Sequence, residues 1–174
     1  MVDYQGPGSL PVPDRSARTV SMFIQILEML GGQNRAEAKD APDRLQVAVA
    51  ALLVHAAGMD DQFSSAERGT IARLLAARFD LKSEAVDKLI AAAEQAVETS
   101  NQLYSFIRVV VDRLDEAERI RLIEMLWEVA YADGVLDPDE DALLRRVAGL
   151  VYVSDKDRGA ARKRALQRMG IAQS

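Results

Sequence analysis

The sequence predicts an all-α fold, a bundle of about eight helices behind an N-terminal tail. Apolar residues recur at steps of three and four along most of the chain, which is the spacing of one face of a helix. They make up 49% of the 174 residues, yet aromatic residues make up only 5%. Leu, Ile, Val, Met and Ala must therefore fill the core, and that mixture favours helices over strands.

The expected domain boundary lies at residue 17. Residues 1–16 contain three prolines and two glycines, a composition that resists regular structure and predicts a flexible tail. Residues 17–170 then form the helical domain. Its first helix is expected at Val20–Leu30, where two glycines end it. We expect this helix to pack against the bundle and not to lie on a membrane.

Capping residues mark the starts of several later helices. Ser64 with Glu67 forms a Ser-x-x-Glu capping box, and Asp115 with Glu118 forms a similar pair. Pro138 follows Asp137 at the first helical position, which proline favours. Further helices are expected at Asp43–Met59, from Ser64, at Ser83–Val97, at Leu103–Leu114, at Ala117–Ala132, from Asp137 and from Ser154.

Two of these segments have unusual apolar patterns. Val47–Val54 is apolar on all sides, which predicts a helix buried on most of its surface. Val109–Val111 is a run of β-branched residues, so a strand remains an alternative within the expected helix there.

Composition and charge exclude several classes of function. Cysteine is absent, which excludes disulfides, thiolate metal sites and a cysteine nucleophile, and fits a cytoplasmic protein. The net charge of −5 argues against a nucleic-acid binder. The strongest apolar stretch near the N-terminus is too short to span a bilayer. Basic residues crowd near the C-terminus, where we expect a solvated helix: Lys156, Arg158, Arg162, Lys163, Arg164 and Arg168.

No set of residues predicts an enzyme. The chain has no glycine-rich phosphate loop and no nucleophile elbow. His55 is the sole histidine, and no nucleophile or second base lies near it in sequence, so it is expected to be a partly exposed helix residue. Trp127 lies in an apolar helix and is expected in the core.

An internal repeat appears when the chain is shifted by 73 positions, and its halves are about residues 43–97 and 116–168. Asp60 then falls on Asp133, and Glu67 falls on Glu140. Each half contains an apolar helix, an acidic turn and a second, amphipathic helix. Two such units with apolar faces to bury can pack about a two-fold-like axis, which would bring the acidic turns together.

The second acidic turn carries the family resemblance. Residues 129–140 read VAYADGVLDPDE and resemble the motif A-x-A-D-G followed by Glu in the tellurite-resistance TerB family. Residues 58–67 form a degraded copy, with Asp61 in place of the motif's glycine. The resemblance covers residues 45–166. It implies an all-helical fold around a buried helix, a role in resistance to tellurite and other stress, and a link to divalent cations.

The candidate cation site combines the acidic residues of both turns. The expected ligands are Asp60, Glu67, Asp133 and Glu140, with Asp61 and Asp137 as helpers. Carboxylate oxygens suit calcium first, and otherwise magnesium, manganese or zinc. The second turn matches only the latter half of an EF-hand loop, because Val129 and Tyr131 occupy the earlier ligand positions. The alternative is that Glu67 and Glu140 simply cap their helices.

Two functions follow from these observations. The first is a non-catalytic TerB-like stress protein that binds a divalent cation through paired acidic turns. The second is a helical protein–protein adaptor or co-chaperone-type module without metal, in which an exposed apolar groove would bind the partner. A protein partner is expected in either case, and neither nucleic acid nor membrane association is. The oligomeric state stays open.

Overall fold

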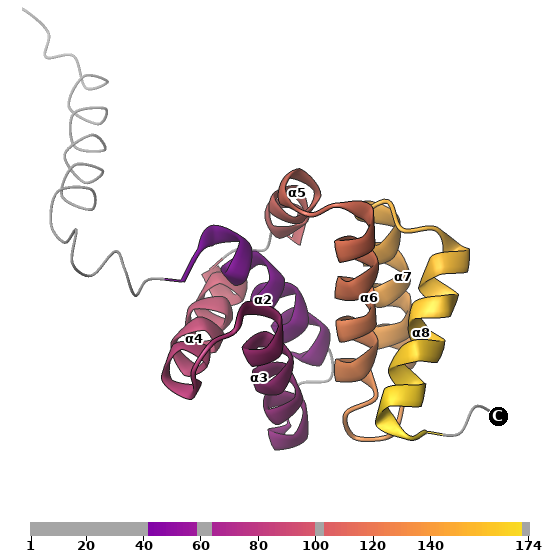
Figure 1. The fold of residues 1–174 in the computed structure, drawn as a ribbon, viewed down its shortest axis with the longest axis horizontal. Coiled ribbons are helices and arrows are strands. Elements are labelled where there is room, and N and C mark those ends of the chain that lie inside the picture. The colour runs from indigo at the N-terminus through magenta and orange to yellow at the C-terminus, as the bar shows by residue number, and fades with distance from the viewer. Residues whose placement is uncertain (1–41, 59–63, 100–102, 172–174) are drawn as a thin grey trace, which may run out of the picture. The chain divides into compact units, whose positions relative to one another are not determined.

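The computed structural model describes residues 42–58, 64–99 and 103–171, all within a unit that begins at Pro42 (Figure 1). The expected tail, the expected helix Val20–Leu30 and the turn with Asp60 and Asp61 lie outside the described residues. The described part contains seven helices and no strand, so the predicted all-α class is confirmed. These helices are α2 (Arg44–Ala57), α3 (Ser65–Phe79), α4 (Ser83–Thr99), α5 (Leu103–Arg113), α6 (Glu116–Ala130), α7 (Pro138–Leu150) and α8 (Asp155–Met169).

The helices begin where the sequence places capping residues. The Ser64 hydroxyl accepts a hydrogen bond from the Glu67 amide, and the Glu67 carboxylate accepts one from the Ser64 amide. Asp115 and Glu118 exchange the same two bonds at the start of α6. Such boxes satisfy amides that the first helical turn leaves unpaired. The β-branched run Val109–Val111 lies within α5, so the strand alternative is wrong.

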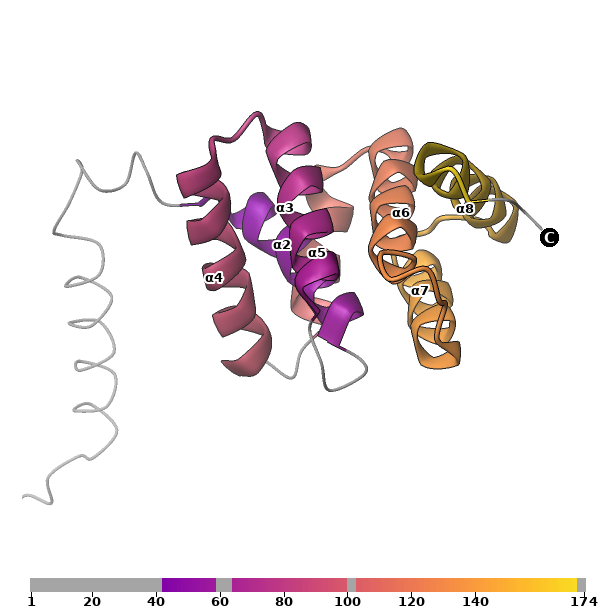
Figure 2. The same ribbon diagram turned by 90° about the horizontal axis from the view of Figure 1, so that it is seen from below.

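Two helices, α2 and α6, lie at the centre of the packing. Helix α2 contacts α3, α4, α5, α6 and α7, and α6 contacts α2, α3, α7 and α8. Each is buried around its whole circumference over part of its length: all residues of 48–54 and of 122–130 are buried. A helix that is apolar on all sides needs neighbours on all sides. Figure 2 shows α2 and α6 with the other helices placed around them.

The surrounding helices each bury one stripe. In α4 the buried residues are Val86, Leu89, Ile90 and Ala93, the stripe that the spacing predicts. In α3 the apolar residues that face the core are Ile71, Leu74 and Leu75. Trp127 is 1% exposed, which confirms its expected place in the core. No described helix has both the length and the apolar character that crossing a bilayer requires.

Helix α8 is attached differently, since it buries only two alanines and one leucine. Its arginines bind two buried carboxylates of α6. Arg168 contacts Glu124 at 2.7 Å and Glu128 at 2.9 Å, and Arg164 also pairs with Glu124. Arg73 of α3 reaches Glu128 from another side at 3.0 Å. Such charge-assisted pairs are strong when the carboxylate is desolvated.

These ion pairs correct one expectation. The basic residues near the C-terminus were expected on a solvated helix. Arg164 and Arg168 stay about half exposed, yet their guanidinium groups pair with α6. Arg162 also contacts α6, because its guanidinium lies over the rings of Trp127 and Tyr131. Helix α8 is thus held by its charges as well as by its apolar face.

The helix bounds keep the spacing of the sequence repeat. Helices α2 and α6 end at Ala57 and Ala130, and α3 and α7 begin at Ser65 and Pro138, both 73 positions apart. Each half contains three consecutive helices, α2–α4 in the first and α6–α8 in the second. In each half the first helix packs against the third, as α2 does against α4 and α6 against α8. The two-fold-like packing of the halves stays a prediction.

Truncation of a central leucine tests the role of α6. Leu126 is fully buried, so Leu126→Ala should lower the free energy of unfolding by about 2–5 kcal/mol through lost contacts and the cavity left behind. Urea unfolding followed by Trp127 fluorescence measures it. The control is Val135→Ala, at a side chain 69% exposed, with an expected loss below about 0.5 kcal/mol. Equal losses in the two variants would contradict the central position of α6.

Candidate cation site

Glu67 and Glu140 occupy equivalent places at the starts of α3 and α7. Each is the third residue of its helix and only 6% and 7% exposed, respectively. The Glu67 carboxylate accepts a hydrogen bond from the Ser64 amide at 2.7 Å, and that of Glu140 accepts one from the Asp137 amide at 3.0 Å. The capping role is therefore present in both turns. Each carboxylate uses one oxygen as a cap, which leaves the other for a further partner.

The second acidic turn has a fixed local geometry. Asp133 accepts a hydrogen bond from the Val135 amide at 2.9 Å, which closes the turn around Gly134. Gly134 has a φ of +87°, a region that residues with a Cβ rarely adopt. Asp137 then caps α7 through the Asp139 amide at 2.7 Å. Asp133 and Asp137 are both exposed, so their remaining oxygens face solvent.

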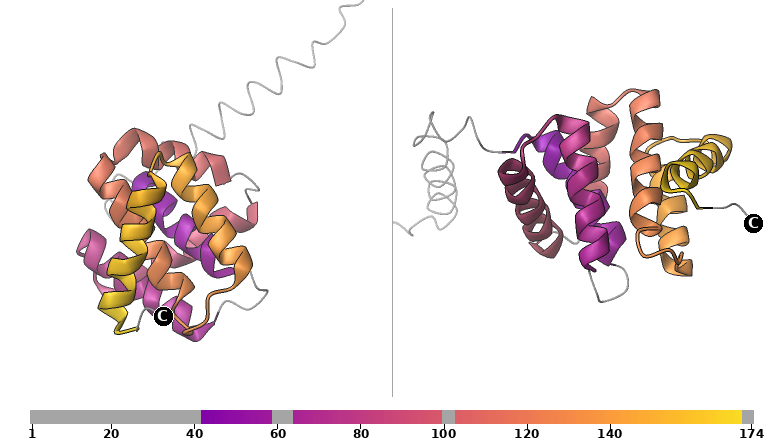
Figure 3. Two further views of the ribbon diagram at one scale, coloured as in Figure 1. Left: turned by 90° about the vertical axis from the view of Figure 1, so that its right-hand side faces the viewer. Right: turned by 60° about the horizontal axis from the view of Figure 1, so that its bottom comes forward.

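The charge of Glu67 acts on Glu140 although the two residues are far apart in sequence. The pKa of Glu140 is raised from 4.5 to about 7, first by burial of the carboxyl and then by the negative charges of Glu67, Asp133 and Asp137. The hydrogen bond from the Asp137 amide acts in the opposite direction. The starts of α3 and α7 lie on the same side of the bundle (Figures 1 and 3).

The described ligands do not by themselves complete a metal site. Within residues 42–58, 64–99 and 103–171, no three His, Cys, Asp or Glu side chains are grouped so that they could hold an ion. The predicted ligand Asp60 and helper Asp61 lie outside those residues. The available donors are carboxylate oxygens, which fit calcium or magnesium better than a metal that prefers nitrogen or sulfur.

Core packing explains why the second turn lacks the first half of an EF-hand loop. Val129 is fully buried, and Tyr131 is 8% exposed. The Tyr131 ring stacks on Trp127 with centroids 6.0 Å apart, and its hydroxyl accepts a hydrogen bond from the Arg162 Nε at 2.9 Å. These two positions serve the core and the attachment of α8, so they supply no cation ligand.

Sequence reasoning missed two buried carboxylates. Glu124 and Glu128 are only 7% and 3% exposed. The available signal was their position within an otherwise apolar helix, four residues apart, together with arginines four residues apart at Arg164 and Arg168. His55, which aligns with Glu128 in the repeat, is half-buried; burial first and Arg146 second lower its pKa.

Neutralising Glu140 should change how stability depends on pH. Because its folded pKa lies above the unfolded value, Glu140 contributes stability that is full below pH 4.5 and lost as pH rises through about 7. Glu140→Gln keeps a capping side chain without the charge. We expect the variant to melt above the wild type at pH 8, with a difference that vanishes towards pH 5. Thermal unfolding across that range measures it.

The control is Glu116→Gln, which removes an exposed carboxylate from the start of α6. His55 titrates in the same window with the opposite sign, because a lowered pKa costs stability as pH falls through the unfolded value. The difference between each variant and the wild type cancels that contribution. A Glu140→Gln difference that stays constant from pH 5 to pH 8 would contradict the raised pKa of Glu140.

Comparison with known proteins agrees with this architecture. The sequence profile described as tellurite resistance protein TerB matches residues 46–163, which cover all of α3–α7 and most of α2 and α8. No curated protein and no solved structure gives a significant match. The matched region is well over half of the 174-residue chain and includes both Glu67 and the turn from Asp133 to Glu140. The chain belongs to the TerB family of tellurite resistance proteins.

Proposed function

We propose that this TerB-family chain is a non-catalytic cytoplasmic stress protein that binds a divalent cation where its two acidic turns meet. The proposed ligands are Asp60 and Glu67 from the first turn and Asp133 and Glu140 from the second, with calcium as the expected ion. The carboxylates then have two roles: they cap α3 and α7, and they supply oxygens to the ion.

The observation that carries this proposal is the pairing of two buried carboxylates from helix starts 73 positions apart. Glu67 and Glu140 are both removed from solvent, and the neighbouring charges that act on Glu140 are all acidic. Like charges held together in a poorly solvated place repel each other. A cation between the turns would offset that repulsion, as a basic side chain does for Glu124 and Glu128 elsewhere in the bundle.

The oxygen chemistry supports calcium. Glu67, Asp133 and Glu140 each accept one backbone amide, which fixes the carboxylate and leaves its second oxygen. Calcium takes six to eight oxygens in flexible geometry and accepts water for part of its shell. The four carboxylates of both turns, Asp60 included, would with water make a weak site, in keeping with the incomplete EF-hand pattern.

Metal titration tests the proposal. A ligand that binds only the folded state stabilises it by about 2.7 kcal/mol at about 100 times its Kd, which raises the melting temperature by several degrees. We expect calcium at millimolar concentration to produce this rise in the wild type. The double variant Asp133→Asn with Glu140→Gln should show no rise, because it keeps the turn geometry and removes two anionic ligands.

The matched control is Asp87→Asn with Glu98→Gln, which removes one aspartate and one glutamate from exposed positions of α4. This control should keep the full calcium response. If calcium, magnesium, manganese and zinc all leave the wild-type melting temperature unchanged at millimolar levels, the cation proposal is wrong and the adaptor alternative takes its place. The adaptor alternative requires an exposed apolar groove. Among the described residues, the exposed large apolar side chains belong to separate segments: Tyr104, Val135 and Tyr152.

A further inference from the structure

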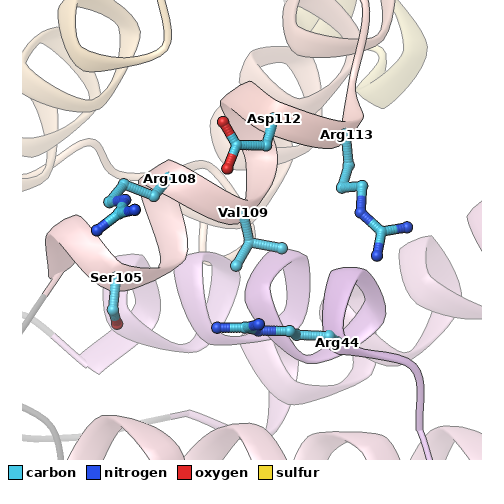
Figure 4. A pocket seen from close by; sticks show the side chains of 6 residues that line it. All are labelled: Arg44, Ser105, Arg108, Val109, Asp112 and Arg113. Carbon is cyan, nitrogen blue, oxygen red and sulfur yellow. The ribbon is translucent and has the colours of Figure 1, made fainter.

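A pocket of about 260 Å³ lies between α5 and the first turn of α2, away from the acidic turns (Figure 4). Its lining is basic, although the chain as a whole carries a net charge of −5. The lining residues are Arg44, Ser105, Arg108, Val109, Asp112 and Arg113. All of them except half-buried Val109 are exposed, so the pocket opens to solvent.

The sequence places these residues together through helix geometry. Ser105, Arg108, Val109 and Asp112 follow one another at steps of three, one and three, which puts them on one face of α5. The buried residues of α5 are Ile107 and Val110, which lie on the other side of the helix.

The arginines approach the pocket from both helices. Figure 4 shows Arg113 extending from α5 towards α2 and Arg44 lying along the start of α2 below Val109. Arg44 is the first residue of α2, where the helix dipole adds positive potential. Arg108 extends from the side of α5 near Ser105.

The arginines of this pocket differ from most others in the described part of the chain. Arg73, Arg78, Arg145, Arg158, Arg164 and Arg168 are held in ion pairs. Within the described residues, Arg44, Arg108 and Arg113 have no hydrogen bond or ion pair. Three cationic groups thus border one hollow with only Asp112 to oppose them. Each guanidinium presents several donors that need an acceptor.

We propose that this pocket binds the phosphate monoester group of a small soluble molecule. A phosphate dianion offers three terminal oxygens and can accept from guanidinium groups that approach from different helices, whereas one carboxylate is satisfied by a single planar fork. Binding would also relieve the repulsion among the three arginines. This site is independent of the proposed cation site, because it shares no residue with the acidic turns.

The rest of the lining indicates the body of the ligand. Val109 provides an apolar surface for a short carbon chain, and Asp112 can accept a hydrogen bond from a ligand hydroxyl. The volume is slightly below the range of about 300–1,000 Å³ that drug-sized ligands occupy. A phosphorylated polyol of a few carbons has this combination of size and groups, so glycerol phosphate is a suitable probe.

Titration of the full chain followed by ¹H–¹⁵N NMR tests the proposal. Glycerol phosphate and inorganic phosphate should shift the backbone amides of α5 and the Nε–H signals of Arg44, Arg108 and Arg113. Arg108→Gln with Arg113→Gln should weaken binding by at least about tenfold, since it removes two of the three guanidinium groups. Arg108→Lys with Arg113→Lys should bind more tightly than the glutamine variant but less tightly than the wild type. Lysine keeps the positive charge and lacks the planar guanidinium that donates two parallel hydrogen bonds.

The control is Lys163→Gln, which removes an exposed positive charge from α8 and should change binding by less than about twofold. Circular dichroism confirms that each variant keeps the helical fold. Phosphate shifts spread evenly over surface arginines, or wild-type affinity in the double glutamine variant, would overturn the proposal. Acetate binding as tight as phosphate would overturn the phosphate class. Vesicles containing phosphatidic acid distinguish the source of the phosphate: if they displace glycerol phosphate from the pocket, the assignment to a soluble molecule is overturned.

Discussion

The fold depends on the need to cover two helices that are buried on all sides over part of their length. Helices α2 and α6 each contain a continuous run of buried residues, so neither can lie at a surface. They pack against each other, and the remaining helices shield what is left. The covering helices need only one apolar stripe each, and their other faces are free to carry charge. The basic pocket lies where a covering helix, α5, meets a central one, α2.

The same constraint explains why acidic side chains enter the interior. Helices α3 and α7 both begin with a capping box, which is a compact way to satisfy the first amides of a helix. The glutamate of each box accepts the N-cap amide and is buried. Two such starts on one side of the bundle concentrate negative charge there. The electrostatic strain on Glu140 therefore arises from the way the helices begin.

Much of the fold was predictable, because local patterns control it. The capping pairs at Ser64 and Asp115 and the stripe Val86–Ala93 are local patterns, and the structure confirms them. Contacts between residues of different helices were harder to predict, because a sequence does not show which helices pack against each other. Glu128, for example, pairs with Arg73 of α3 and Arg168 of α8, which lie 55 and 40 positions away in the sequence. The basic pocket depends likewise on Arg44 meeting α5, 60 or more positions away. The cation ligands stay a prediction, in part because Asp60 lies outside the described residues.

The ion pairs at Glu124 and Glu128 have a consequence for how this sequence can vary. Each carboxylate sits in a space shaped by guanidinium groups, and Arg168 is shared by both. Loss of Arg168 leaves each buried carboxylate with one arginine partner in place of two, and loss of either glutamate leaves Arg168 with one carboxylate partner. A single neutral replacement is therefore costly, while an apolar replacement of the whole group is tolerable. Substitutions at these positions should therefore occur together in evolution, with the glutamates of α6 and the arginines of α3 and α8 replaced as a group.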